Sequence, residues 1–216
     1  MRERLRGLYV IIDPSATLRT GPEAARGRDE LSPAREAIEG GARLVQLRDK
    51  HREKGLQLPL AEALARLCRE RGVPFIVNDH VDLALAAGAD CVHVGQKDLP
   101  VAAVRRLVPA GFIVGCSTNN VAEAKRAEAD GADYVSVGRL YPTGSKEDTR
   151  PASTETIVQV RARVSLPVCA VGGINESNID EVIAAGAEMA AVIAAVVGAS
   201  DVREAARRLA AKFSHR

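Results

Sequence analysis

The chain has 216 residues, 46% of them hydrophobic, which is enough to bury the core of one domain, and nothing in it marks a second. Lys and Arg total 30 against 28 for Asp and Glu, the cations are dispersed, and aromatic residues make up 3%, so nucleic-acid binding has little support. The longest apolar run, 189–197, is too short to cross a bilayer, and the amino terminus leaves no room for a secretory signal. We therefore expect a single cytoplasmic domain, residues 1–216, with no membrane partner.

Apolar runs along the chain predict eight strands separated by helices. The helical stretches show apolar residues at helical spacing and lie near 62–70, 121–129, 154–163 and 178–185. Strands that are apolar throughout, each followed by a helix, indicate a parallel sheet that is covered on its outside. The predicted strands lie near 8–13, 43–48, 74–79, 91–95, 112–117, 134–138, 167–173 and 188–194.

Eight such units in a chain of this length favour an α/β fold of one particular kind, a single-domain (β/α)8 TIM barrel. Its active site would lie in the loops at the carboxyl ends of the strands. An open doubly wound sheet is the alternative, but it would have fewer units and usually one dominant glycine motif. The four cysteines show no paired metal-ligand spacing, and three fall in predicted strands, so we expect buried thiols.

The first strand leads into an irregular loop, residues 14–30, which contains three arginines. A loop this long between a strand and a helix is unusual. It is either a lid over the barrel mouth, which would bring Arg26 and Arg28 near a bound phosphate, or a loop without a functional role. The sequence does not decide between them.

The second predicted strand ends in Gln46-Leu47-Arg48-Asp49-Lys50. Alternate residues of an extended chain share a face, so Gln46, Arg48 and Lys50 would converge. Two cations and an amide donor suit a polyphosphate. The alternative is a solvated strand end with ordinary surface charges.

Two carboxylates follow two further strands, Asp79 after Asn78 and Asp98 after the run 91–95. Single oxygen ligands from different elements suit a magnesium ion that also binds substrate phosphates. Each aspartate could instead cap the helix that follows it. Polar or glycine-rich residues end three other strands or follow them, at 115–118, 142–146 and 171–174.

Together these segments resemble the thiamine phosphate synthase family. The motifs run in order from the first strand to the eighth: Gln46-Leu47-Arg48-Asp49-Lys50, Asn78-Asp79, His93-Val94-Gly95-Gln96-Lys97-Asp98, Gly115-Cys116-Ser117, Pro142-Thr143-Gly144-Ser145-Lys146 and Val171-Gly172-Gly173-Ile174. The resemblance implies a magnesium-dependent transferase of thiamine biosynthesis. It would join hydroxymethylpyrimidine diphosphate to hydroxyethylthiazole phosphate, or a carboxylated form of it, and release diphosphate.

The resemblance also implies residue roles. Asp79 and Asp98 would hold Mg2+. Arg48, Lys50, Ser117 and Lys146 would act on the reacting diphosphate. The pyrimidine diphosphate would be held by Gln46, Arg48, Lys50, Asn78, Ser117 and Lys146, and the thiazole phosphate by Thr143, Ser145, Gly173, Ile193 and Ala194.

Three positions depart from the family pattern. Arg139 stands where proline is usual, Ser145 replaces threonine, and Ala194 lacks a hydroxyl that the family generally carries as serine. Two other functions stay open: a thiazole tautomerase of the same barrel, which needs no diphosphate site, and a non-catalytic barrel that binds a phosphate ligand. The sequence also leaves the oligomeric state open, with a homo-oligomer as one alternative.

Overall fold

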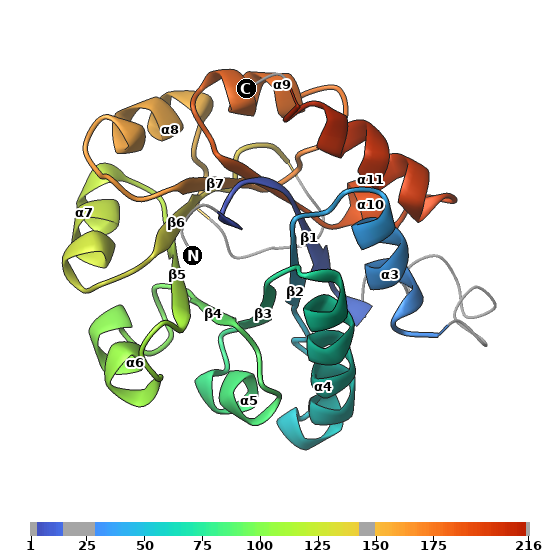
Figure 1. Ribbon diagram of the computed structural model, residues 1–216. Helices are drawn as coiled ribbons and strands as arrows, with labels where there is room; N and C mark the ends of the chain where they lie inside the picture. The colour runs from blue at the N-terminus through green and yellow to red at the C-terminus, as the bar shows by residue number, and fades with distance from the viewer. Residues whose placement is uncertain (1–3, 15–28, 143–149, 215–216) are drawn as a thin grey trace.

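The computed structural model describes residues 4–14, 29–142 and 150–214 (Figure 1). Most of the 14–30 loop, with Arg26 and Arg28, lies outside these residues, as do Thr143, Ser145 and Lys146. Eight strands are described: β1 (Gly7–Ile12), β2 (Leu44–Leu47), β3 (Phe75–Asn78), β4 (Cys91–Val94), β5 (Ile113–Thr118), β6 (Tyr134–Val137), β7 (Val168–Val171) and β8 (Met189–Val192).

The strands form one closed barrel in which every neighbouring pair is parallel and follows chain order. The closing pair sets Tyr9 of β1 opposite Ala191 of β8, while the other edge of β1 sets Tyr9 opposite Leu44 of β2. The predicted TIM barrel is therefore confirmed, and the open sheet is excluded.

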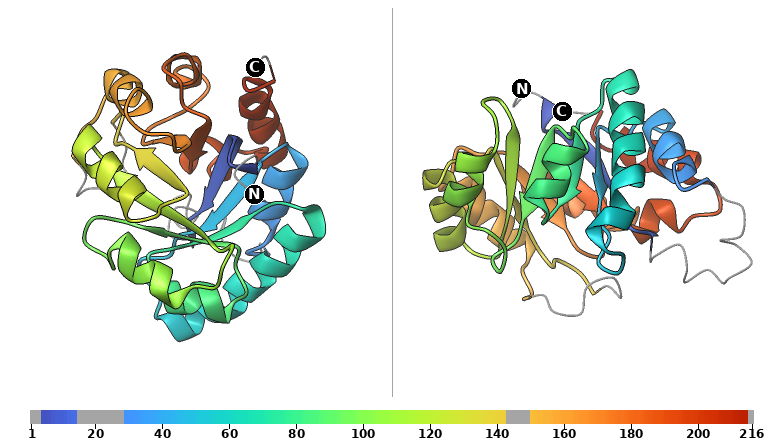
Figure 2. Two further views of the ribbon diagram at one scale, coloured as in Figure 1. Left: turned by 60° about the vertical axis from the view of Figure 1, so that its left-hand side comes forward. Right: turned by 90° about the horizontal axis from the view of Figure 1, so that it is seen from below.

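Helices surround the barrel, as the views in Figures 1 and 2 show. The predicted helix 121–129 matches α7, but the helix predicted near 62–70 begins earlier, because α4 starts at Lys54 and continues through Pro59. None of the described helices is both long and apolar enough to span a membrane. The described helices are α3 (Ser32–Glu39), α4 (Lys54–Arg71), α5 (Val81–Ala86), α6 (Val101–Leu107), α7 (Val121–Ala129), α8 (Thr154–Arg161), α9 (Ile179–Ala184), α10 (Ala194–Val197) and α11 (Val202–Ala211).

The core has two parts because side chains alternate across each strand. Outward residues pack against the helices, whereas inward residues fill the barrel; the inward set includes Leu44, Ile76, Cys91, Ile113, Cys169 and Met189. All four cysteines are buried and free, as predicted.

Gly115 makes room for the largest inward side chain on the neighbouring strand. It lies opposite Tyr134 in the β5–β6 register. A Cβ atom at Gly115 would stand 2.2 Å from Cζ of Tyr134 and 2.5 Å from its hydroxyl oxygen. The absence of a side chain at Gly115 therefore allows the fully buried Tyr134 ring to lie across the barrel interior.

We expect Gly115→Ala to lower the free energy of unfolding by about 1–3 kcal/mol, the usual cost of overpacking a core. Urea denaturation measures the change. Gly55→Ala is the control, because a Cβ there meets nothing within 4 Å and alanine is the better helix former. Equal stability of the Gly115 variant and the wild type would contradict the packing argument.

Candidate active site

The described residues that are predicted to bind substrate lie at the carboxyl ends of the strands or shortly after them. The register sets Gln46 beside Ile76, Asn78 beside His93, and Ser117 beside Ser136. Because Ile76 belongs to the cluster that fills the barrel, Gln46 next to it also faces inward, and the alternation along β3 turns Asn78 the same way. The closed sheet therefore gathers these three residues around one mouth.

Gln46, near the end of β2, and Arg48 and Lys50, which follow it, each have a different partner. The amide nitrogen of Gln46 donates to the hydroxyl of Tyr9 at 2.7 Å. Arg48 pairs with Asp13, at 2.5 Å between Nη1 and Oδ2, and both side chains are largely buried. Lys50 pairs with Asp79. The two cations are therefore held in place by carboxylates, which argues against an ordinary solvated strand end.

Asp79 and Asp98 lie next to each other, close enough for their carboxyl groups to share one proton. Asp79 is the one described non-glycine residue with positive φ, at 64°, so the backbone makes an unusual turn directly after β3. Asp98 accepts a hydrogen bond from the backbone nitrogen of Gly95 at 2.7 Å. The helices that follow have His80 and Pro100 at their N-cap positions, so neither aspartate is the cap that the alternative predicted.

The two carboxyl groups have opposite pKa shifts. Burial raises the pKa of Asp79, but hydrogen bonding and the charge of Lys50 outweigh burial and leave that pKa below its usual value. For Asp98, burial and the neighbouring Asp79 raise the pKa more than the Gly95 amide lowers it. Two adjacent carboxyl groups need a shared proton or a cation, because two bare charges repel. This oxygen pair fits magnesium.

The described residues offer no cluster of three or more His, Cys, Asp and Glu side chains placed to hold a metal. Asp79 and Asp98 would thus supply part of a magnesium coordination shell, and the remainder would come from water and substrate. Magnesium commonly binds in this way, through one or two carboxylates and substrate phosphates.

A hydrogen-bonded set of inward side chains below the mouth was not predicted from the sequence. The hydroxyls of Tyr9 and Tyr134 are 3.3 Å apart, and the Tyr134 hydroxyl is 2.9 Å from Nδ1 of His93. Nε2 of His93 is 2.9 Å from the Ser117 hydroxyl and 3.4 Å from that of Ser136. The available signal was the period-two placement of polar residues within otherwise apolar strands.

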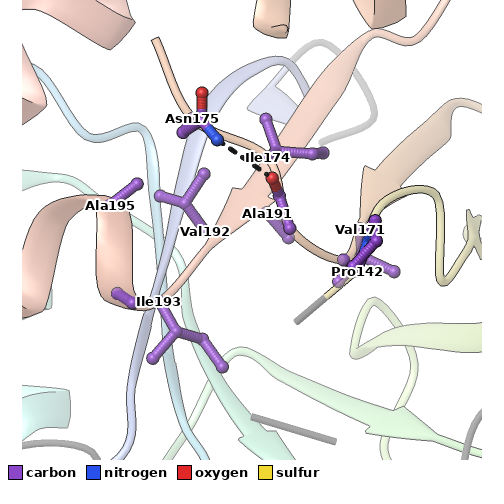
Figure 3. Close-up of a pocket in the computed structure, with 11 residues that line it drawn as sticks. Pro142, Val171, Ile174, Asn175, Ala191, Val192, Ile193 and Ala195 are labelled. Atoms are coloured by element: carbon purple, nitrogen blue, oxygen red, sulfur yellow. Dashed lines mark hydrogen bonds between the residues drawn. The ribbon is translucent and has the colours of Figure 1, made fainter. Parts of the chain in front are cut away.

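A pocket of about 390 Å3 opens beside the ends of β7 and β8 (Figure 3). Its wall contains Gly173, whose φ is +66° and whose position leaves no room for a side chain, since a Cβ would come within 2.6 Å of the Pro142 carbonyl. Gly173 also accepts a hydrogen bond from the Asn175 side chain at 3.3 Å. Ile193 and Ala194 also line it, so the pocket brings together all three described residues predicted to bind the thiazole phosphate.

The two described departures from the family pattern have different surroundings. Ala194 is the first residue of α10, and the backbone N–H groups of Ala194 and Ala195 donate to none of the described residues. Arg139 is half-buried, and its backbone exchanges hydrogen bonds with Arg150 and Ala152. Its Cα packs against Gly172, behind the pocket wall.

The fold defines a class: a (β/α)8 barrel whose candidate active site lies at the carboxyl ends of its strands. The family model described as thiamine monophosphate synthase matches residues 8–196. The chain belongs to this family, and its activity is that of a thiamine-phosphate synthase, a transferase of thiamine biosynthesis.

Similar proteins cover nearly the whole chain. A thiamine-phosphate synthase of Methanocella arvoryzae is 47% identical over 208 residues, covering 96% of this chain and 94% of that protein. One from Methanoculleus marisnigri is 47% identical over 203 residues, covering 94% and 92%. The structure of a thiamine phosphate pyrophosphorylase from Pyrococcus furiosus superposes with a TM-score of 0.87 at 36% identity, covering 99% of this chain and 98% of that one.

The loop that carries Lys50 is anchored by Asp49, which is 7% exposed. Its carboxylate accepts hydrogen bonds from the backbone nitrogens of His51 and Arg52, both at 3.0 Å, and pairs with the Arg52 side chain. Burial raises the pKa of Asp49, but the hydrogen bonds from Arg52 and His51 outweigh it and leave the pKa below its usual value.

Because folding lowers this pKa, Asp49 stabilises the fold above its unfolded-state pKa, and that contribution is lost as pH falls through the folded-state value. We expect Asp49→Asn to lower the free energy of unfolding at pH 7 by about 1–3 kcal/mol, the scale of hydrogen bonds to a charged group. The difference in the free energy of unfolding between the variant and the wild type should become smaller at acidic pH. Urea denaturation at several pH values measures it, with Asp180→Asn as an exposed control; a gap independent of pH would contradict the assignment.

Proposed function

We propose that the mouth performs the synthase reaction on two phosphorylated substrates, 4-amino-2-methyl-5-hydroxymethylpyrimidine diphosphate and 4-methyl-5-(2-hydroxyethyl)thiazole phosphate or its carboxylated form. The observation that carries this proposal is the cluster of Lys50, Asp79 and Asp98, where a cation and two adjacent carboxyl groups meet. That arrangement suits a metal-bound diphosphate. The proposal also assigns the protein to the cytoplasm.

Asp79 and Asp98 would hold Mg2+, and the diphosphate oxygens would complete its coordination. When bound, magnesium would neutralise part of the negative charge on the leaving diphosphate. Arg48 and Lys50 would add positive charge from the β2 side, with Lys146 contributing from outside the described residues. Because Asp13 and Asp79 hold Arg48 and Lys50, these cations need little reorganisation when substrate arrives.

The chemical step needs no side-chain nucleophile. The bond between the pyrimidine methylene and the diphosphate oxygen breaks, and diphosphate leaves with the electron pair. The thiazole nitrogen then donates its lone pair to the methylene carbon. If the carboxylated thiazole is the acceptor, its carboxyl group would leave as CO2 and the bonding electron pair would stay on the thiazole ring. Gln46, Asn78 and Ser117 would hold the pyrimidine so that this carbon faces the thiazole, and positioning would supply much of the rate.

The thiazole phosphate would lie in the pocket beside β7 and β8. Gly173 allows close approach there, and the N–H groups of Ala194 and Ala195 are oriented by the first turn of α10. Thr143 and Ser145 would join them from the loop beyond Pro142. The missing hydroxyl at Ala194 then removes one auxiliary hydrogen bond and leaves the backbone donors in place.

A tautomerase acting on the thiazole phosphate alone would use this pocket but would need no diphosphate site. The paired carboxyl groups beside Lys50 favour the synthase over that alternative. They also disfavour a non-catalytic barrel that binds a simple phosphate, because phosphate binding does not require a metal held by two aspartates. The discriminating experiment is diphosphate release with both substrates, in the presence and absence of a chelator: the synthase stops, whereas monophosphate binding continues.

Asp79→Asn and Asp98→Asn should each lower turnover sharply and raise the magnesium concentration needed for half-maximal rate, because each removes a charged ligand from a site with few. Asparagine keeps the shape of aspartate and tolerates the positive φ of Asp79. Calorimetric titration of Mg2+ with diphosphate gives a second readout that is independent of turnover.

Asp82→Asn is the matched control, since that carboxylate pairs with Lys54 on the surface and is 65% exposed. It should leave the magnesium response unchanged. Full activity of the Asp79 and Asp98 variants at limiting magnesium would refute the metal assignment.

Ala194→Ser should lower the half-saturating concentration of thiazole phosphate by about 3- to 10-fold, the scale of one hydrogen bond to a charged group less its desolvation. The response to pyrimidine diphosphate should not change. Steady-state titration of each substrate on both proteins measures this. A shift in the pyrimidine response alone would place the thiazole phosphate elsewhere, with Arg139 as the next candidate.

A further inference from the structure

Five side chains form a continuous chain of hydrogen bonds across the barrel interior, from β2 to β5, and we call them the relay. In order they are Gln46, Tyr9, Tyr134, His93 and Ser117, joined by the contacts of 2.7, 3.3, 2.9 and 2.9 Å described above. The two ends of the relay are residues of the proposed pyrimidine site. The three middle members have no role in the mechanism so far.

Proton directions along the relay follow from its first member. The amide nitrogen of Gln46 can only donate, so the Tyr9 oxygen accepts and its own proton is free to pass to Tyr134. Either hydroxyl of the Tyr9–Tyr134 pair can be the donor. When Tyr9 donates, Tyr134 donates in turn to Nδ1 of His93, which then carries no proton, and the imidazole proton lies on Nε2. That N–H donates to Ser117.

We propose that the relay is polarised from Gln46 to Ser117 and fixes the hydrogen-bonding sense of both ends. Gln46 is left with its carbonyl oxygen as an acceptor, and Ser117 with its hydroxyl hydrogen as a donor. This inference rests on the proposed pyrimidine site. An aminopyrimidine diphosphate suits the two ends, because its amino group is a donor and its ring nitrogens and diphosphate oxygens are acceptors. Tyr9, Tyr134 and His93 are then positioning residues.

The surroundings of the relay support this direction. Gln46 makes no second hydrogen bond with any described residue, so its carbonyl oxygen has no competing donor there. Burial raises the pKa of Tyr9 and of Tyr134 well above the usual value, so both hydroxyls keep their protons. The Ser136 hydroxyl, 3.4 Å from Nε2 of His93, is a second acceptor for the same N–H group.

The first test reads the tautomer of His93 in the substrate-free protein by 15N NMR, with the resonance assigned through its loss in His93→Gln. The relay predicts a proton on Nε2 and none on Nδ1. A proton on Nδ1, or on both nitrogens, would overturn the proposal. Because no substrate is present, this result is independent of the proposed function, which the diphosphate-release assay tests separately.

Two variants that each remove one buried oxygen test the consequence for substrate. Tyr9→Phe removes the hydrogen-bond acceptor of Gln46 but leaves Tyr134 donating to His93, so the tautomer of His93 should not change. The KM for pyrimidine diphosphate should rise about 5- to 10-fold, the scale of one hydrogen bond. Tyr134→Phe should raise the same KM and also allow the Nδ1–H tautomer. KM for thiazole phosphate should stay constant in both.

A purely structural role for the two tyrosines would lower the melting temperature and leave both the tautomer and the pyrimidine KM unchanged, and that outcome would overturn the proposal. If either variant fails to fold, the 15N NMR measurement of the His93 tautomer in the wild-type protein still tests the proposal.

Discussion

The backbone pairing of β1 with β8 is the constraint on which the rest of the structure depends. It closes the sheet, so strands separated by most of the chain become neighbours, and Tyr9 lies opposite both Leu44 and Ala191. Closure also gives every strand one inward face, and it gathers Gln46, Asn78 and Ser117 from three strands around a single mouth. The pocket beside β8 and the carboxyl pair after β3 and β4 belong to the same opening only because the ring is complete.

Within that opening, charge balance determines the chemistry. Each described cation on the β2 side is held by a carboxylate, Arg48 by Asp13 and Lys50 by Asp79. The additional carboxyl group, Asp98, lies next to Asp79, and burial together with this neighbouring charge raises its pKa. In the proposed site a divalent cation would relieve that repulsion and would offset part of the charge of the diphosphate. In this proposal the substrate would complete the metal site, so two carboxylates from the protein would suffice.

The sequence predicted the barrel because eight apolar runs alternated with amphipathic ones, and the carboxyl ends of parallel strands necessarily meet. It placed Asp79 beside Asp98 for the same reason. It could not predict the bonds from His93 to Tyr134 and Ser117, because contacts across the barrel interior depend on the stagger between strands. Gly115 shows this limit well: its position in a strand end was visible, but its function, room for Tyr134, depends on the β5–β6 register. The proline within α4 similarly concealed the first turns of that helix.

A metal site that substrate completes would bind magnesium and diphosphate in a linked manner. Isothermal titration of Mg2+ into the protein, with and without saturating diphosphate, measures the coupling. We expect magnesium alone to bind the protein weakly and to bind at least about 10-fold more tightly when diphosphate is present. Diphosphate should gain the same factor in affinity when magnesium is present. Tight magnesium binding without diphosphate, or a diphosphate affinity that does not change with magnesium, would contradict a metal site completed by substrate.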